Sequence, residues 1–505
     1  MTAQRRQVAI SGTLVREQPA PSAGRTLHLS RQRRVALTAV AMVVLAVVMA
    51  AWVAWLVSGF REHLGVFDFS QYYAAAHALR LDPHANIYSA VVLDASGAAG
   101  HVAQQPPLPY LYTVLPVLLL IPLTLLPFAI AAQVWFALNT CIWLGATLLL
   151  AVELRHLLRD ALHDVLRGSS ATGNENVWGQ LIADPSWPVA LAGAAALSFV
   201  ARPTTLTLAL GQINLMVLLA FALLPGMLRH HQERAIGVTV ALATMVKLTP
   251  VLLLGYLALT RRWKALAWAV GALAVLSLAG IAVVGPQTFF ALLPALQTNG
   301  MAAAAFANNE SLVAPAGNAL LAALPSLDAI IHVAIYAMLA GLAWAMGTVL
   351  AISARHAPAE TGEQERAAFA QFAIAVCGVL LLLPTYVEAH HYAMLLPAEV
   401  LIVGLLAREW LCASNSSRAR AALYALGFGV LACALMSLPL PNGWDSDPFP
   451  RASLLFSLPL RPWLQELRPL GALLLAFLGA RCALGTLKGL GSEFRSMALP
   501  ALRHG

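Results

Sequence analysis

The run VALTAVAMVVLAVVMAAWVAWLV, residues 35–57, contains no charged side chain and is long enough, as a helix, to cross a lipid bilayer. It is too long for the core of a signal peptide, and no A-x-A-like cleavage site with a soluble chain follows it. Similar runs recur along the 505 residues, of which 60% are hydrophobic and 11% charged. Because lipid offers the backbone no hydrogen-bond partners, such runs form helices. The sequence therefore predicts an all-α, polytopic transmembrane bundle.

The apolar runs fill most of the chain and leave no room for a folded soluble domain. We expect one membrane domain over residues 35–484 with about 10–13 membrane segments, given the roughly 20 residues of one helical crossing. The tails, 1–34 and 485–505, are expected on the cytoplasmic side, and the first is expected to be disordered. The segments after the first run are 111–127, 130–152, 187–201, 206–225, 235–246, 249–260, 265–284, 327–352, 368–384, 391–407, 421–439 and 466–483.

Positive charge sets the expected topology. Seven arginines precede the first run, whereas the stretch 58–112 carries two arginines against four acids. By the positive-inside rule, the N-terminus lies inside and 58–112 is the first external loop, which we expect to carry short amphipathic helices. The loops 285–326, 385–390 and 440–465 are then external as well. The same rule accounts for the net charge of +8 without a nucleic-acid partner, because no basic block is interleaved with aromatics.

Two regions break the regular count of crossings. The run 235–260 has basic residues at both ends but is long enough for only about one crossing, so we interpret it as two half-helices hinged around Lys247–Pro250. The segments 111–127 and 130–152 pose a similar problem. The prolines in this region and the arginines of the following loop, 153–185, indicate that one of the two segments does not fully cross the membrane. Broken helices are tolerated where they are buried in protein or line a polar cavity. The sequence therefore predicts a cavity.

The stretch FDFSQYYAAAHALRLDPHANIY, residues 67–88, places polar and aromatic side chains shortly after the first run. Asp68 is either a functional carboxylate or only the N-cap of a helix, with Gln71 completing a capping box. Tyr72 and Tyr73 either belong to a site or anchor the chain at the membrane interface. These residues by themselves leave both alternatives open.

Cationic and amide side chains mark two other stretches. Lys247 lies inside an apolar run, where a central charge costs roughly 2.5–3.5 kcal/mol, so it either binds an anionic group or snorkels to the surface. Arg202 lies at the expected external end of 187–201, where an arginine that only sets topology would be unusual. Gln212 and Asn214 follow with amide donors and acceptors. We predict that these four residues bind substrate.

A short external loop contains Glu388 and the adjacent His390 and His391, which either bind substrate or cap two helices. Adjacent histidines point in different directions, and the five cysteines lack metal-ligand spacing, so neither a metal site nor a disulfide framework is predicted. Asp68, Arg202 and this loop all fall on the expected external side. A carboxylate, cations and amides that converge near lipid indicate an anionic, lipid-borne substrate.

Several motifs follow one another in an order that is more specific than any one of them. They are Asp68 with Phe69, Tyr72 with Tyr73, PPLPYLYTVLPVLLLIPLTLLPF (106–128), GQINL (211–215), MVKLTPVLLL (245–254), NNESL (308–312) and TYVEAHHYAMLLP (385–397). With these motifs, from about residue 65 to 410, the chain resembles the glycosyltransferase family 87 proteins. These are polytopic GT-C enzymes, among them polyprenyl-phosphate-mannose-dependent mannosyltransferases and arabinofuranosyltransferases of bacterial envelopes.

The resemblance implies a GT-C bundle in the bacterial inner membrane, with the active site on the external, periplasmic face. It implies a catalytic Asp in the first external loop, which maps onto Asp68 as general base on an acceptor hydroxyl. The implied donor is a sugar, with mannose the first candidate, on a polyprenyl monophosphate, and the implied acceptor is an envelope lipid or glycan. Tyr72 and Tyr73 are expected to hold the adjoining helix at the membrane interface and to flank the sugar.

The residues suit this chemistry. A phosphate leaves without protonation, so one carboxylate is enough. No cofactor is expected, and no ligand cluster in the sequence demands a metal. In-line attack inverts the anomeric centre. Departure raises the negative charge on the phosphate, which cations or hydrogen-bond donors must stabilise. Arg202, His390 and His391 are the candidates, followed by Lys247.

Two other functions stay open at this stage. A flippase or transporter of lipid-linked saccharides would also need broken helices and a buried lysine. It would often show an internal repeat, but the 67–88 stretch has no counterpart in the second half of the chain. A scaffold or receptor for lipid carriers would not need Asp68. The glycosyltransferase is therefore the leading hypothesis.

Overall fold

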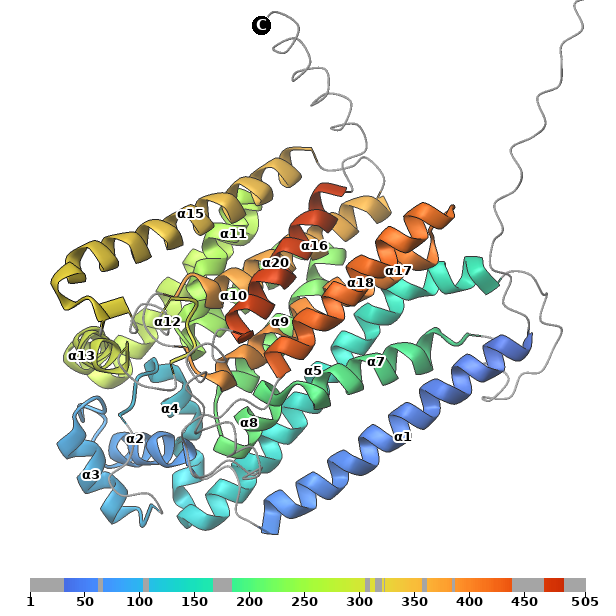
Figure 1. The fold of residues 1–505 in the computed structure, drawn as a ribbon. Coiled ribbons are helices and arrows are strands. Elements are labelled where there is room, and N and C mark those ends of the chain that lie inside the picture. Colours follow the sequence, from blue (N-terminus) through green and yellow to red (C-terminus); the bar gives the residue numbers. More distant parts are fainter. Residues whose placement is uncertain are drawn as a thin grey trace, which may run out of the picture.

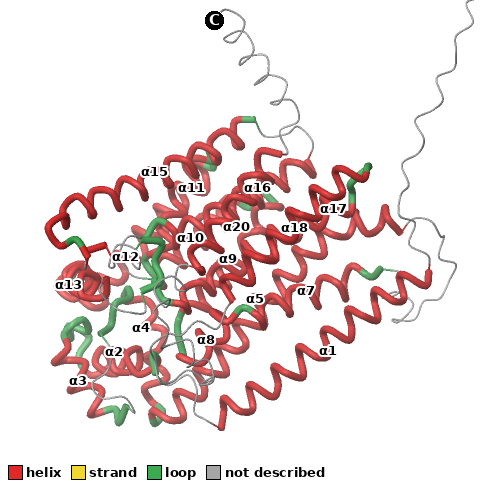
Figure 2. The backbone as a smooth tube through the Cα atoms, in the orientation of Figure 1, coloured by secondary structure: helices red, strands yellow, loops and turns green. Residues whose placement is uncertain are grey.

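The computed structural model describes most of the membrane domain, and every regular element within the described residues is a helix (Figure 2). The described ranges are 31–61, 67–102, 109–166, 184–304, 309–313, 320–321, 323–356, 361–383, 387–437 and 467–485. The prediction of an all-α bundle is confirmed. The expected tails fall largely outside these ranges, as does the whole of the expected external loop 440–465, so the domain boundaries stay predictions.

The α-helices differ widely in length, and the described part of the chain also contains four short 3-10 helices. The α-helices are α1 (Arg31–Arg61), α2 (Phe69–Leu81), α3 (Ala90–Ala99), α4 (Val114–Leu120), α5 (Phe128–Leu166), α7 (Ser186–Val200), α8 (Arg202–Leu210), α9 (Asn214–Arg229), α10 (Glu233–Val246), α11 (Leu253–Leu259), α12 (Trp263–Phe290), α13 (Leu292–Ala304), α15 (Asp328–Arg355), α16 (Thr361–Leu381), α17 (Leu396–Leu411), α18 (Ser416–Ser437) and α20 (Leu467–Gly485). The 3-10 helices are η1 (Ile121–Leu125), η2 (Thr249–Leu252), η3 (Pro325–Leu327) and η4 (Ala389–Leu395).

The long helices lie side by side, with α1 along one edge and α15 along another (Figure 1). α16, α17 and α20 pack together in the interior, while α5 packs on α7, α9 and α17. The short helices α2, α3 and α4 gather at one end, which we call the α2 end (Figure 1). Large apolar side chains stay exposed on the outer helices, including Val43 on α1, Val275 on α12 and Val333 on α15. Such a surface is expected where helices face lipid.

Within the described residues, seven helices are long and apolar enough to cross a membrane, or up to eight if the bent pair α7 and α8 is one span. We expected about 10–13 segments, at roughly 20 residues for each crossing. The difference arises because several expected segments are shorter helices: α9, α10 and α17 have 16, 14 and 16 residues. The chain is thus a multi-pass membrane protein in which short helices surround part of the interior.

Helix breaks occur at both places that the sequence indicated. α10 ends at Val246, and Lys247 adopts an extended conformation before η2 and α11 follow. The expected segment 111–127 becomes α4 and η1, a short apolar helix of residues Val114–Leu125, whereas α5 is long enough to cross. Whether the two halves of 235–260 enter from the same side stays a prediction.

One break was not expected. The run 206–225 was predicted as a single segment, but α8 ends at Leu210 and α9 begins at Asn214. Gly211 between them has φ 74°, a left-handed conformation that ends an α-helix and that glycine adopts without strain. The prediction of a continuous helix was therefore wrong at Gly211.

The described part of the first external loop differs from the expected amphipathic helices. All residues of α2 from Phe69 to Leu79 are buried, because the helix packs against α3, α4 and η1. The alanines Ala74, Ala75 and Ala76 allow this close approach on several sides. α2 is thus part of the folded core at the α2 end.

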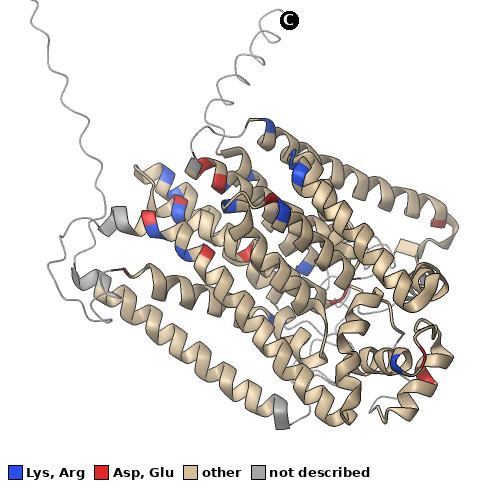
Figure 3. Ribbon diagram, turned by 180° about the vertical axis from the view of Figure 1, so that it is seen from behind, with Lys and Arg blue, Asp and Glu red and all other residues tan. Residues whose placement is uncertain are grey.

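Charged residues of the described ranges gather at the end of the bundle opposite to the α2 end, which we call the charged end (Figure 3). The N-terminal end of α1 lies there too (Figure 1). This distribution agrees with a cytoplasmic charged end and an external α2 end, an orientation that stays a prediction.

Candidate functional site

The turn GQIN, residues 211–214, connects α8 to α9 near the α2 end. Its backbone is fixed by hydrogen bonds from Gln212 N to Thr207 O at 2.9 Å and from Trp135 Nε1 to Gly211 O at 2.7 Å. Asn139 Nδ2 of α5 also donates to Gln212 O at 3.4 Å. The turn is therefore held rigidly against α5, and its two amide side chains project from a fixed position.

Asp68 precedes α2 and lies against this turn. Its backbone N–H donates to Leu210 O at 2.8 Å. Its carboxylate accepts from Gln212 Nε2 at 2.6 Å and from Gln71 Nε2 at 3.3 Å, and the residue is 4% exposed. Asp68 occupies the N-cap position of α2 but makes no capping hydrogen bond with its side chain, so the capping-box alternative is wrong. Two amide side chains hold the carboxylate instead.

The surroundings make the Asp68 carboxylate unusually basic. Its pKa is raised to about 8, first by burial and next by the nearby charge of Glu388. The hydrogen bond from Gln212 and the charge of Lys247 lower the pKa but do not cancel the effect of burial. A carboxylate with this pKa can accept a proton from a hydroxyl near neutral pH far better than an ordinary aspartate.

Two tyrosines orient the Gln212 amide. Tyr72 and Tyr112 donate their hydroxyl protons to Gln212 Oε1 at 2.8 and 2.9 Å, so the NH₂ group of this amide is directed to Asp68. Tyr73 instead donates to Leu126 O at 2.8 Å. Tyr72 and Tyr73 are 0% and 3% exposed, so the alternative that they anchor the chain at the membrane interface is wrong.

Lys247 approaches the same turn from the break between α10 and η2. Its Nζ donates to Asn214 Oδ1 at 2.8 Å and lies 5.8 Å from the centroid of the Tyr112 ring, where a cation–π contact is favourable. The residue is only 8% exposed, so the snorkelling alternative is wrong. The GQIN turn thus holds a carboxylate through Gln212 and an ammonium group through Asn214.

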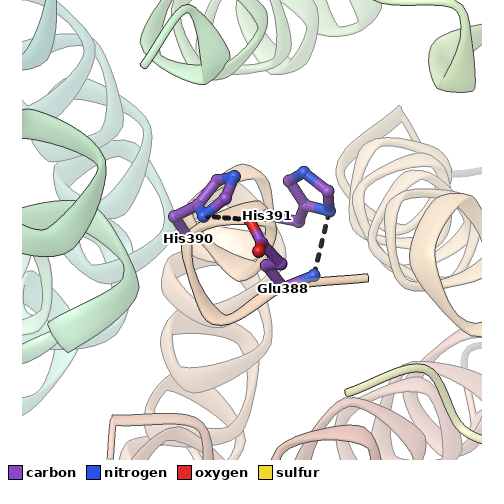
Figure 4. Close-up of side chains that lie close together, drawn as sticks. All are labelled: Glu388, His390 and His391. Carbon is purple, nitrogen blue, oxygen red and sulfur yellow. Dashed lines mark hydrogen bonds and ion pairs between the residues drawn. The ribbon is translucent and has the colours of Figure 1, made fainter. Parts of the chain in front are cut away.

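The histidine loop, Glu388–His391, packs on the other side of Asn214. The carbonyl of His390 accepts from Thr207 Oγ1 at 3.0 Å and from Asn214 Nδ2 at 3.3 Å. Glu388 Oε2 lies 3.1 Å from His390 Nδ1, and the Glu388 backbone N–H donates to His391 Nδ1 at 3.2 Å (Figure 4). Glu388 and His391 also form a capping box at the start of η4, so the helix-capping alternative is confirmed for this pair.

The two imidazoles are close together, with ring centroids 4.4 Å apart. Burial, and next the charge of Lys247, lower the pKa of His390 and His391 well below the ordinary value, which disfavours their cationic forms. His391 accepts a hydrogen bond at Nδ1, so its neutral ring carries the proton on Nε2, whereas Nδ1 of His390 faces the Glu388 carboxylate.

The histidine loop is also a candidate metal-binding group. Ligand atoms of Glu388, His390 and His391 lie within 4.8 Å of one another, and a carboxylate with two imidazoles is a donor set that zinc accepts. Nδ1 of each histidine bonds to Glu388, which orients both rings, so a metal ion here would be held through the Nε2 atoms.

Arg202 is the first residue of α8, directly after the bend of 61° between α7 and α8. It is 7% exposed and acts electrostatically on the carboxylate of Glu310. Glu310 belongs to the described segment 309–313, and its backbone N–H donates to the carbonyl of Val387, the residue directly before the histidine loop. Arg202 is thus linked to the site through this second carboxylate.

The structure connects most of the residues predicted from the sequence. Hydrogen bonds join Asp68, Tyr72, Gln212, Asn214, Lys247 and the backbone of His390. Tyr73 bonds to Leu126 and packs on Phe128, with ring centroids 5.3 Å apart.

Sequence reasoning did not assign Tyr112 or Gln71 to the site, nor Glu388 as a partner of His390. The available signal for Tyr112 was the aromatic pair with Tyr110 directly before the proline-containing segment.

Comparison with known proteins gives one match. Residues 110–385 match the model of Glycosyltransferase family 87, whereas no curated protein and no solved structure matches the chain. Asp68 and both histidines lie outside the matched residues, so their roles rest on the geometry. The match covers more than half of the 505 residues. The chain therefore belongs to glycosyltransferase family 87, and it is a multi-pass membrane glycosyltransferase.

Proposed function

We propose that this protein transfers a sugar, with mannose the first candidate, from a polyprenyl-phosphate donor to an envelope lipid or glycan. Asp68 is the general base on the acceptor hydroxyl. The donor phosphate binds near Lys247 and the histidine loop, and Tyr72 lies beside the sugar. Membership of the family supports sugar transfer in general, and the finer assignments rest on the arguments below.

One observation carries the proposal: a basic carboxylate and a buried cation are held by two amide side chains of the same turn. Asp68 bonds to Gln212 and Lys247 bonds to Asn214, so each charge has an uncharged partner. The two charges act on each other electrostatically. This arrangement keeps an acceptor-activating group and a phosphate-binding group at a fixed separation, as a transfer between two bound substrates requires.

These groups account for every bond and proton of the proposed transfer. The acceptor oxygen attacks the anomeric carbon, its proton passes to Asp68, and the bond from that carbon to the phosphate oxygen breaks. The departing phosphate monoester gains negative charge, which Lys247 and the Nε2–H of His391 in the histidine loop stabilise more strongly than the ground state. A phosphate needs no proton to leave, so a single carboxylate suffices. Attack opposite to the leaving group inverts the anomeric configuration.

The distribution of charge supports an external site. Lys and Arg of the described ranges gather mainly at the charged end, although Arg80 lies on α2 (Figure 3). Under the positive-inside rule the α2 end then faces the periplasm of a bacterial inner membrane. A donor made on the cytoplasmic side would be flipped before use.

The test uses purified protein in detergent, labelled mannose on polyprenyl phosphate, and a membrane-lipid extract as the acceptor source. We expect a labelled lipid or glycan product of inverted configuration. Nucleotide-activated mannose, supplied to the same protein, should give none. Transfer from the nucleotide donor alone would overturn the proposed donor, and a retained configuration would overturn the mechanism. Movement of the lipid-linked sugar across vesicles without transfer would favour the flippase.

A further inference from the structure

Arg468 is a fully buried arginine in the first turn of α20. Its guanidinium forms an ion pair with the Glu310 carboxylate, and its Nε donates to Met436 O at 3.2 Å. The ion pair joins residues 158 positions apart in the sequence. Arg468 also lies outside the residues 110–385 that match the family. A guanidinium that is 0% exposed does not act as a surface charge that sets the orientation of the chain in the membrane. Another role therefore explains Arg468.

The partner of Arg468 holds the histidine loop at both ends. Glu310 N donates to Val387 O at 2.6 Å, and Tyr392 Oη donates to Glu310 O at 2.8 Å. Val387 N donates in addition to Asn309 Oδ1 at 3.2 Å. Glu388, His390 and His391 lie between these two attachment points. The position of the histidine loop therefore depends on where Glu310 is held.

The burial of the pair makes this dependence strong. Both side chains are at most 1% exposed, so the free energy of the pair is little screened by solvent. Removal of either partner leaves a buried charge without its main counter-charge, which displaces the segment that carries it. Arg202 also acts on the same carboxylate, so Glu310 is the anion between two arginines.

We infer that Arg468 is a positioning residue of the active site, which acts through Glu310 to fix Glu388, His390 and His391. The assignment of this loop to the donor phosphate rests on the proposed function. The positional effect itself rests only on the contacts of Glu310 and does not depend on the substrate.

The first experiment compares Arg468→Met, Arg468→Lys and Glu310→Gln with wild type in the transfer assay. Small misplacements of active-site groups cost up to about 100-fold in rate, so we expect Arg468→Met to lower kcat/KM for the donor by about ten-fold or more. The KM for the acceptor should stay unchanged. Arg468→Lys keeps the charge and should recover most of the loss. The matched control is Arg481→Met, which removes an exposed ion pair from the same helix and should have no effect.

The second experiment measures amide hydrogen exchange of peptides from 387–395 in the same variants. We expect faster exchange in Arg468→Met and Glu310→Gln, with no change in Arg481→Met and unchanged exchange in α5. Wild-type exchange in both variants would overturn the inference, as would normal donor kinetics in folded Arg468→Met. If the Met variant does not fold, Arg468→Lys and Glu310→Gln decide by the same criteria. If the variants exchange faster but the wild-type protein transfers no sugar, the positional role of Arg468 is retained and the proposed function is overturned.

Discussion

At the α2 end, Asp68 and Lys247 each bind an uncharged amide, whereas at the charged end Arg481 binds Glu409 directly and Arg155 binds Asp184 directly. The pairs at the charged end are partly exposed, with side-chain exposures of 35% and 46% for Arg481 and Glu409. Oppositely charged side chains that form an ion pair in contact with solvent contribute little to the stability of the protein or to catalysis. Buried charges that are hydrogen-bonded but kept apart are available to a substrate. The difference indicates where the reaction takes place.

The largest expected effect follows from removal of the carboxylate at the α2 end. Asp68→Asn keeps the size of the side chain but cannot accept a proton, so we expect kcat/KM to fall by about 10²–10⁴-fold. Initial rates of transfer, with the folded fraction measured by size-exclusion chromatography, provide the check. Glu409→Gln removes a carboxylate at the charged end and should leave the rate unchanged. Equal rates in Asp68→Asn and wild type would remove Asp68 from the mechanism.

Lys247→Met should produce the next largest effect. The methionine keeps an apolar chain of similar length but leaves the phosphate without its cation, so we expect a loss of about 10²-fold in kcat/KM for the donor. Lys264, exposed at the start of α12, provides the matched control as Lys264→Met. Donor saturation curves measure both variants. A similar loss in both would show that the position of Lys247 has no special importance.

Tyr112→Phe should produce a smaller effect. It removes the hydroxyl that donates to Gln212 Oε1 but keeps the ring near Lys247. One hydrogen bond contributes about 0.5–1.5 kcal/mol, so the rate should fall by about 2- to 12-fold. Tyr336→Phe, at an exposed position of α15, should have no effect on the rate. A loss as large as that of Asp68→Asn would mean that Tyr112 itself takes part in proton transfer.

The smallest effect is expected at the charged end. Removal of the exposed pair in Arg481→Met combined with Glu409→Gln should change the free energy of unfolding by less than about 1 kcal/mol. Transfer activity should equal that of wild type. Thermal unfolding in detergent and the transfer assay provide the measurements. A large loss of activity would contradict the contrast between the two ends.

The fold was predictable where the sequence pattern is local. Apolar runs without charges indicated the helices, and Lys247 followed by Pro250 indicated a break in an apolar stretch. The break at Gly211 was missed, because a single glycine within an apolar run does not reveal the left-handed conformation that ends α8. Helices such as α9 were counted as crossings because composition does not fix their length.

The site was predictable as a set of residue types but not as a set of contacts. Asp68, Gln212 and Lys247 could be selected because polar side chains in or near apolar segments are costly and therefore informative. The contact between Asp68 and Gln212 joins residues 144 positions apart, and no local pattern encodes such a pair. Glu310 and Arg468 illustrate the same limit, since each is an ordinary polar residue until the fold buries it.

The dependence of kcat/KM on pH tests the central claim most directly, because it reports the pKa of the base in the free enzyme. Burial and the charge of Glu388 raise the pKa of Asp68 to about 8, and the proposed general base acts in its deprotonated form. We therefore predict that kcat/KM increases with pH and levels off above a midpoint near 8. Glu388→Gln removes the charge that raises this pKa, so its midpoint should lie at lower pH. A flat profile across neutral and mildly alkaline pH, or a midpoint that Glu388→Gln leaves in place, would contradict the account.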